Sequence, residues 1–75
     1  MLSIEQVIEY CEGKGRHYAF DLEYIKKDGE LCRFNEVKCL GVYKAETIRI
    51  IFPNTEVRKI IINSIIQFNG KEVIH

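Results

Sequence analysis

The spacing of apolar residues at the start of the chain predicts a short amphipathic helix over about residues 3–12. Positions i, i+3, i+4 and i+7 form one apolar stripe, which is typical of a helix that covers a sheet. The stripe consists of Ile4, Val7, Ile8 and Cys11. Ser3 and Gln6 have the S-x-x-Q spacing of a capping box, and Gly13 can end the helix in a left-handed conformation.

After the helix, the apolar period changes from 3.6 to 2, which predicts strands. We expect five or six of them, at about residues 16–26, 30–40, 46–52, 56–62, 65–68 and 71–74. Asp28-Gly29 and Asn69-Gly70 are hairpin signals, because these residues accept the positive φ angles of tight turns. In the last hairpin, Phe68 should pair with Lys71, which places Ile65 and Ile74 together on one face.

The second predicted strand changes its alternation part of the way along. Cys32 and Phe34 have one parity, whereas Val37 and Cys39 have the other. A β-bulge near Asn35 would return both pairs to the same face and would bend the strand.

Together these elements predict an α+β fold made of a single small domain, residues 1–75. The N-terminal helix is followed by a five- to six-stranded antiparallel meander, because strands that follow one another usually pair. Strongly bent strands in so short a chain favour a curled sheet or an SH3-like small barrel, with the helix over one face or end.

The stretch KIIINSII carries isoleucine on both faces of a predicted strand, and a strand that is apolar on both faces is usually covered on both. One interpretation is that all of these residues are core, with the helix on one side. The other is that one face contacts another copy of the protein or a protein partner. The interface residues would then be Ile61, Ile65 and Ile74.

Composition and charge disfavour several classes of protein. The chain has eleven basic and eleven acidic residues, so it lacks the basic excess typical of nucleic-acid binders. No apolar run approaches the length of a membrane span, and we expect no export signal. Three cysteines, Cys11, Cys32 and Cys39, are odd in number and irregularly spaced, which disfavours a disulfide framework and favours a reducing cytoplasm.

No catalytic or metal-binding motif is present, so we expect a non-enzymatic protein without cofactor or metal. The cysteines with His17 or His75 could supply a Cys3His zinc site, but no CxxC or HxxxH pair supports one. Asp21, Glu23 and Glu36 could converge for acid–base chemistry, although alternation on a solvated strand face also explains them.

The predicted helix, the bent meander and a one-turn break at Asn63-Ser64-Ile65 resemble the architecture of SH3-like and Sm-like small barrels. The chain lacks the residues of the Sm-like uridine pocket and the Trp-containing groove of signalling SH3 domains. The resemblance therefore implies a fold and no RNA site. The ending IIQFNGKEVIH also resembles that of short bacterial proteins from mobile-element gene neighbourhoods.

Two functional hypotheses follow. The first is a small interaction module that self-associates or binds a protein partner through the apolar residues named above. The second is a small nucleic-acid-binding barrel, in which basic side chains and an aromatic ring form a charged stacking surface. That surface would consist of Tyr43, Lys44, Arg49 and Arg58.

Overall fold

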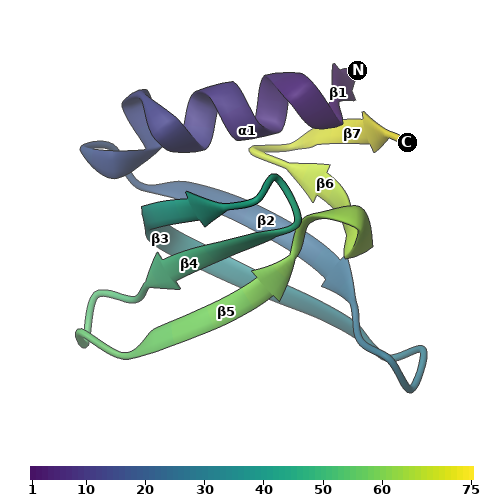
Figure 1. Cartoon of the computed structure of the whole chain (residues 1–75). Helices are drawn as coiled ribbons and strands as arrows, with labels where there is room; N and C mark the ends of the chain where they lie inside the picture. Colours follow the sequence, from purple (N-terminus) through teal and green to yellow (C-terminus); the bar gives the residue numbers. More distant parts are fainter.

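The computed structural model describes residues 1–75 and contains one α-helix, two 3₁₀ turns and seven strands (Figure 1). In chain order these are β1 (Leu2–Ser3), α1 (Ile4–Glu12), η1 (Lys14–Arg16), β2 (Phe20–Ile25), β3 (Leu31–Tyr43), β4 (Thr47–Ile51), β5 (Val57–Ile61), η2 (Ile62–Ser64), β6 (Ile65–Phe68) and β7 (Lys71–Ile74).

Helix α1 begins as the sequence predicts. The Ser3 hydroxyl accepts a hydrogen bond from the Gln6 amide at 3.2 Å, and the Gln6 side chain accepts one from the Ser3 amide at 2.9 Å. This reciprocal pair satisfies two amides that a helix start otherwise leaves free. Val7 and Cys11, on the apolar stripe, are fully buried. The helix is nine residues long, and neither it nor the shorter 3₁₀ turns could form an apolar membrane-spanning helix.

The sheet is mixed, and its order is β1-β7-β6-β2-β3-β4-β5. Strands β2 to β5 form an antiparallel meander, but β6 leaves β5 and pairs with β2 instead. β1 runs parallel to β7. The expectation of five or six antiparallel strands was therefore wrong in number and direction. A two-residue strand such as β1 has no period that a pattern could reveal.

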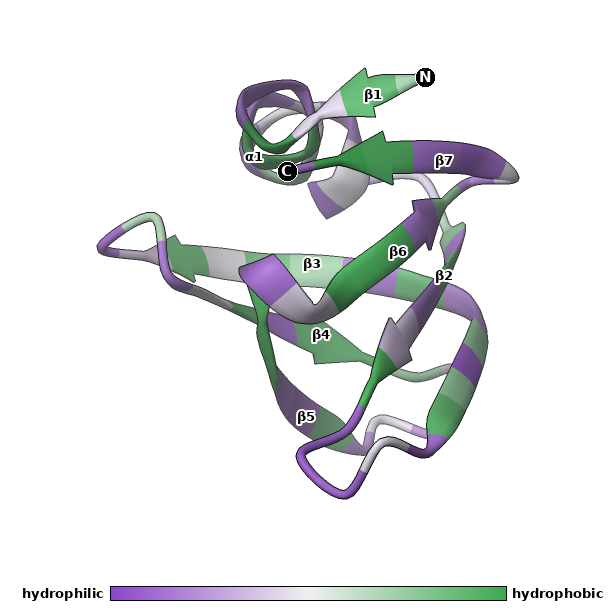
Figure 2. Ribbon diagram, turned by 90° about the vertical axis from the view of Figure 1, so that its right-hand side faces the viewer, coloured by the Kyte–Doolittle hydropathy of each residue, from purple (hydrophilic) through white to green (hydrophobic).

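The sheet curls without closing, because β5 has no hydrogen-bonded neighbour beyond β4. Helix α1 lies over one opening of the curl, alongside β7 (Figures 1 and 2). Its apolar side faces the strands. The curled-sheet form of the expectation thus describes the protein better than a closed barrel.

The predicted bulge in β3 is confirmed. Phe20 pairs with Val37 but Leu22 pairs with Phe34, so β3 contains one extra residue between these pairs. Glu36 has a φ of 55°, and its amide donates a hydrogen bond to the Asp21 carboxylate at 3.0 Å. The bulge returns Val37 to the core side and bends β3.

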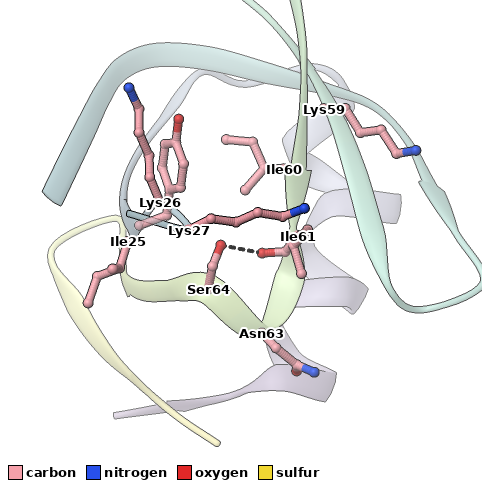
Figure 3. Close-up of a pocket in the computed structure, with 9 residues that line it drawn as sticks. Ile25, Lys26, Lys27, Lys59, Ile60, Ile61, Asn63 and Ser64 are labelled. Atoms are coloured by element: carbon pink, nitrogen blue, oxygen red, sulfur yellow. Dashed lines mark hydrogen bonds between the residues drawn. The ribbon is translucent and has the colours of Figure 1, made fainter. Parts of the chain in front are cut away.

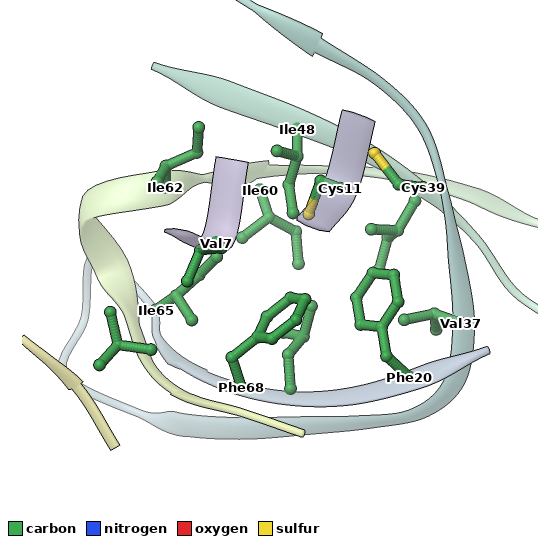
Figure 4. Close-up of a cluster of buried hydrophobic side chains, with 13 residues drawn as sticks. Val7, Cys11, Phe20, Val37, Cys39, Ile48, Ile60, Ile62, Ile65 and Phe68 are labelled. Carbon is green, nitrogen blue, oxygen red and sulfur yellow. The ribbon is translucent and has the colours of Figure 1, made fainter. Parts of the chain in front are cut away.

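Thirteen buried apolar residues form one core inside the curl (Figure 4). Beneath the helix, the rings of Phe20 and Phe68 lie 4.7 Å apart, and Tyr10 meets both edge-on. A second aromatic cluster, Tyr24, Phe34 and Phe52, packs beside the core with ring separations of 5.2 and 4.8 Å. Aromatic packing of this kind adds about 0.5–1.5 kcal/mol per pair beyond burial.

The Asn69-Gly70 turn is also confirmed, with φ angles of 54° and 80° and Phe68 paired with Lys71. The predicted facing of Ile65 was wrong, because Ile65 is fully buried. Its register against β2 shifts between Glu23 and Tyr24, which makes Ile66 an extra residue and turns Ile65 inward with Phe68.

The isoleucine-rich stretch divides between core and surface. Ile60 and Ile62 are buried, whereas Ile61 is 48% exposed. The interpretation of all these residues as core is therefore wrong for Ile61. The helix covers an opening of the sheet and leaves the outer face of β5 bare.

Candidate protein-interaction edge

Strand β5 forms one edge of the sheet. Which of its backbone amides and carbonyls are free depends on which of its residues form hydrogen bonds with β4. The Ile62 amide donates to the Glu46 carbonyl at 2.9 Å, and the Phe52 amide donates to the Glu56 carbonyl at 2.8 Å. Antiparallel pairs alternate between hydrogen-bonded and non-hydrogen-bonded residues. On β5, Arg58 and Ile60 therefore bond to β4.

Val57, Lys59 and Ile61 are the non-hydrogen-bonded members, so their amides and carbonyls point away from β4. The hydroxyl of Ser64 donates to the Ile61 carbonyl at 2.6 Å and closes that end of the ladder. Ile61 is also the N-cap residue of η2, so its carbonyl is already the first acceptor of that 3₁₀ turn. Among the backbone hydrogen bonds of turns, loops and caps, none involves Val57 or Lys59. We call this open ladder, Val57–Ile61, the β5 edge.

A shallow groove of about 460 Å³ lies beside the β5 edge, between it and the end of β2 (Figure 3). Its lining comes from the end of β2 and the adjoining turn, from β5 and from η2. The lining residues are Tyr24, Ile25, Lys26, Lys27, Lys59, Ile60, Ile61, Asn63 and Ser64. We call it the basic groove.

The charge of the basic groove is positive and almost unopposed. Its only ion pair joins Lys26 to Glu30 at 4.0 Å, and both side chains are exposed, so the pair contributes little. Lys27 and Lys59 have no carboxylate within ion-pair distance. In Figure 3 the Lys27 side chain extends across the groove toward β5. Burial raises the pKa of Tyr24 at the end of the groove, and its neighbour Cys32 acts in the same direction.

A row of positive charge crosses the outer face of the sheet and ends at the β5 edge. Arg49 on β4 lies directly opposite Lys59. On its other side Arg49 pairs with Gly41, which has no side chain. The Arg49 guanidinium lies 5.2 Å from the centre of the Tyr43 ring, a cation–π contact. Like charges directly opposite one another destabilise a sheet.

The structure brings together part of the predicted nucleic-acid patch. Tyr43 and Arg49 are in contact on the outer face, and Lys44 follows in the β3–β4 turn. Arg58 has the parity of buried Ile60 and its charge acts on Tyr24, so it lies on the other face of the sheet from Arg49. The residue opposite Arg49 is Lys59, which the sequence reading had not assigned to the patch.

The three isoleucines of the predicted interface do not share a surface. Ile61 and Ile74 are each 48% exposed, but β5 is one edge of the sheet and β7 is next to the other. Ile65 is 0% exposed and offers nothing to a partner. Only Ile61 lies in the candidate site.

Sequence reasoning missed Lys26, Lys27 and Lys59 as a group. Each was visible as a basic residue beside a strand, but more than thirty positions separate Lys27 from Lys59. The curl of the sheet brings the end of β2 to β5. The register of a hairpin shows which residues of two paired strands lie opposite each other. It gives no information on strands that lie close together without pairing.

The arrangement of side chains gives little support to a metal site or to a reactive cysteine. No three or more His, Cys, Asp or Glu residues are grouped so as to hold a metal ion. Cys11 and Cys39 are buried in the core, and the Cys39 thiol donates to the Gly41 carbonyl at 3.6 Å. Hydrogen bonding with Cys39, and then burial, raise the pKa of Cys11, which packs as a small neutral thiol.

Comparison of the chain with family models, curated proteins and solved structures found no match.

Proposed function

We propose that the protein is a non-enzymatic interaction module that binds an extended segment of a protein partner along its β5 edge. The observation that carries this proposal is the open ladder of Val57, Lys59 and Ile61. Strand addition to an exposed edge is a recurrent mode of peptide recognition, in which main-chain hydrogen bonds supply affinity. Proteins usually shorten or cover their edges, and this five-residue edge is neither short nor covered.

The side chains beside the ladder support the same function. Val57 and Ile61 are 47% and 48% exposed on the outer face, with Lys59 between them. An added strand would place its own side chains against these residues, at the short distances of cross-strand neighbours. Both apolar contact and charge are therefore available to a partner.

We also propose that the protein works in a reducing cytoplasm and uses no cofactor. Three free cysteines support the first point, because an oxidising compartment favours disulfides. For the second, the groove is lined by lysine, isoleucine, tyrosine, asparagine and serine side chains, and no three His, Cys, Asp or Glu side chains are grouped so as to hold a metal ion.

A relationship to SH3-like small barrels is part of the proposal. It is supported by the helix before the strands, the bent strand β3 and the single 3₁₀ turn η2 between β5 and β6. The relationship concerns architecture alone and assigns no ligand.

Peptide selection combined with a proline block tests the proposed function. A random peptide display library is panned against the purified protein, and amide hydrogen exchange maps where the selected peptides bind. We expect slower exchange at Val57, Lys59 and Ile61. Val57→Pro removes an outward-facing amide at the first position of β5, where proline is tolerated. It should weaken binding about tenfold, the value of one hydrogen bond.

Val57→Thr is the matched control, because it retains the amide and a β-branched side chain. It should bind within about twofold of the wild type, the scale of a surface substitution. Protection at another surface, or equal binding by both Val57 variants, would exclude the β5 edge as the site.

Single-stranded nucleic acid is the second candidate, favoured by the Arg49–Tyr43 contact at 5.2 Å on the outer face. A cation beside an aromatic ring offers charge and stacking to a strand of bases. Titration with oligothymidylate at two salt concentrations tests it, because phosphate binding weakens as salt rises. Binding that is absent or insensitive to salt would remove this candidate.

A further inference from the structure

The outer face beside the β5 edge carries a positive charge that the chain itself does not neutralise. Arg49 is flanked across the sheet by Gly41 and by Lys59. The same-face neighbours along β4 and β5 are uncharged: Thr47, Ile51, Val57 and Ile61. Lys59 has a cross-strand neighbour on one side only. The position directly opposite Lys59 on its other side is empty until another strand is added.

The groove side of the β5 edge is basic as well. Lys26 and Lys27 line the groove, and only Lys26 has a carboxylate near it. Arg58 projects toward the inner side, where its charge acts on Tyr24. Whichever face an added residue occupied, it would meet a cation.

A second copy of the chain is poorly matched to this edge. β5 has the sequence VRKII, with two basic residues and no acidic one. A symmetric pair of β5 strands would bring Arg58 and Lys59 of both copies together, and like charges across a sheet are destabilising. The opposite edge, β1, is only two residues long and runs directly into the helix. A lysine on an exposed edge is a common device against such self-pairing.

We infer that the β5 edge binds an acidic extended peptide, with an Asp or Glu of that peptide directly opposite Lys59. This inference rests on the proposed function and deepens it by naming the partner's chemistry. The open backbone ladder supplies the register, and the Arg49–Lys59 row together with the basic groove supplies the charge. The carboxylate would neutralise a row that ends unpaired at the edge of the sheet.

Three capped synthetic peptides test the inference: Ser-Thr-Val-Thr-Glu-Thr-Val-Thr-Ser and its counterparts with Gln or Lys in place of Glu. Binding to the wild-type protein is measured by titration at low salt, with amide exchange to locate each peptide. We expect the Glu peptide to bind about fivefold more tightly than the Gln peptide, the scale of an exposed ion pair. The preference should shrink as salt rises.

Charge reversal assigns the preference to Lys59. Lys59→Glu should reverse the order, so that the Lys peptide binds more tightly than the Glu peptide. Lys14→Glu changes the net charge by the same amount at the exposed turn η1, and it should keep the wild-type order. A reversal in both variants would show a general charge effect and would overturn the assignment to Lys59.

The possible failures are distinguishable. If the Glu and Gln peptides bind equally and both protect the β5 amides, the acidic-partner inference is wrong and the proposed function stands. If no peptide protects those amides, the proposed function fails with it. A concentration-dependent dimer in light scattering, with β5 amides protected in the dimer, would make a second copy the occupant. Displacement of the Glu peptide by oligothymidylate would make nucleic acid the competing ligand of this edge.

Discussion

The two edges of the sheet differ in length, in covering and in charge. At one edge, β1 is two residues long and passes directly into helix α1. Its neighbour β7 buries Val73, and the ring of His75 forms a hydrogen bond of 2.7 Å with the Ile65 carbonyl on β6. At the other edge, β5 leaves the amides and carbonyls of Val57 and Lys59 and the amide of Ile61 without a neighbouring strand.

The difference shows two ways of controlling an exposed sheet edge. The β1 edge is shortened and its groups are occupied by the chain itself, so little is left for another strand to bind. The β5 edge keeps its ladder and has Lys59 in the middle of it. Charge at this position disfavours pairing with a second β5 while leaving the backbone available to a complementary strand.

The largest predicted effect separates the inward and outward residues of the β5 region. Ile60→Ala should lower the free energy of unfolding by about 2–5 kcal/mol, because it leaves a cavity in the core. Ile61→Ala should cost less than about 1 kcal/mol, because that side chain is half exposed. Denaturant melts of both variants measure the difference. Equal costs would mean that Ile61 is covered in solution, as it would be in a stable oligomer.

The next effect concerns the hairpin that builds the covered edge. Gly70 has a φ of 80° in the turn between β6 and β7. Gly70→Val should cost more than about 1 kcal/mol, because a β-branched residue is strained at positive φ. Gly70→Asn is the control, since asparagine accepts this conformation, and it should cost less. Equal stabilities of the two variants in denaturant melts would contradict the turn geometry.

Local features of the fold were predictable because a few neighbouring residues determine them. The capping box needs only Ser3 and Gln6, and the final turn needs only Asn69-Gly70. The bulge in β3 followed from the change of parity between Phe34 and Val37, which no regular strand could accommodate. Each of these is a statement about spacing within a short stretch of chain.

The features that the sequence did not predict depend on how distant segments meet. The parallel pairing of β1 with β7 joins the two ends of the chain, and the return of β6 to β2 follows the η2 break. The candidate site was missed for the same reason, because Lys27 and Lys59 meet only through the curl. Arg49 was identified, but its true neighbour across the sheet depends on the register that the β4–β5 turn sets.

Removal of one serine hydroxyl at each edge should have a smaller effect on stability. Ser3 caps the helix that follows β1, and Ser64 donates to the Ile61 carbonyl at the end of the β5 edge. Ser3→Ala should cost about 1 kcal/mol of stability, the usual value of a helix cap. Ser64→Ala should cost about 0.5–1 kcal/mol, because the Ile61 carbonyl loses the hydrogen bond from the hydroxyl. Thermal melts of both variants test these values, and an unchanged stability of Ser64→Ala would show that the hydroxyl does not support the end of β5.

The smallest predicted effect has the opposite sign. Lys59→Glu replaces a like-charge pair with an ion pair across the sheet, because residue 59 lies directly opposite Arg49. The isolated protein should become more stable by about 0.2–1 kcal/mol at low salt, the range of cross-strand charge pairs. The stability of Lys59→Gln should lie between that of Lys59→Glu and that of the wild type. Denaturant melts in low and high salt measure the gain, which should decrease as salt screens the charges. The same substitution should weaken binding of the acidic peptide, so Lys59 would lower stability while supporting recognition. A loss of stability in Lys59→Glu would show instead that Lys59 makes a favourable contact within the fold, and the unpaired Arg49–Lys59 row would no longer account for its position.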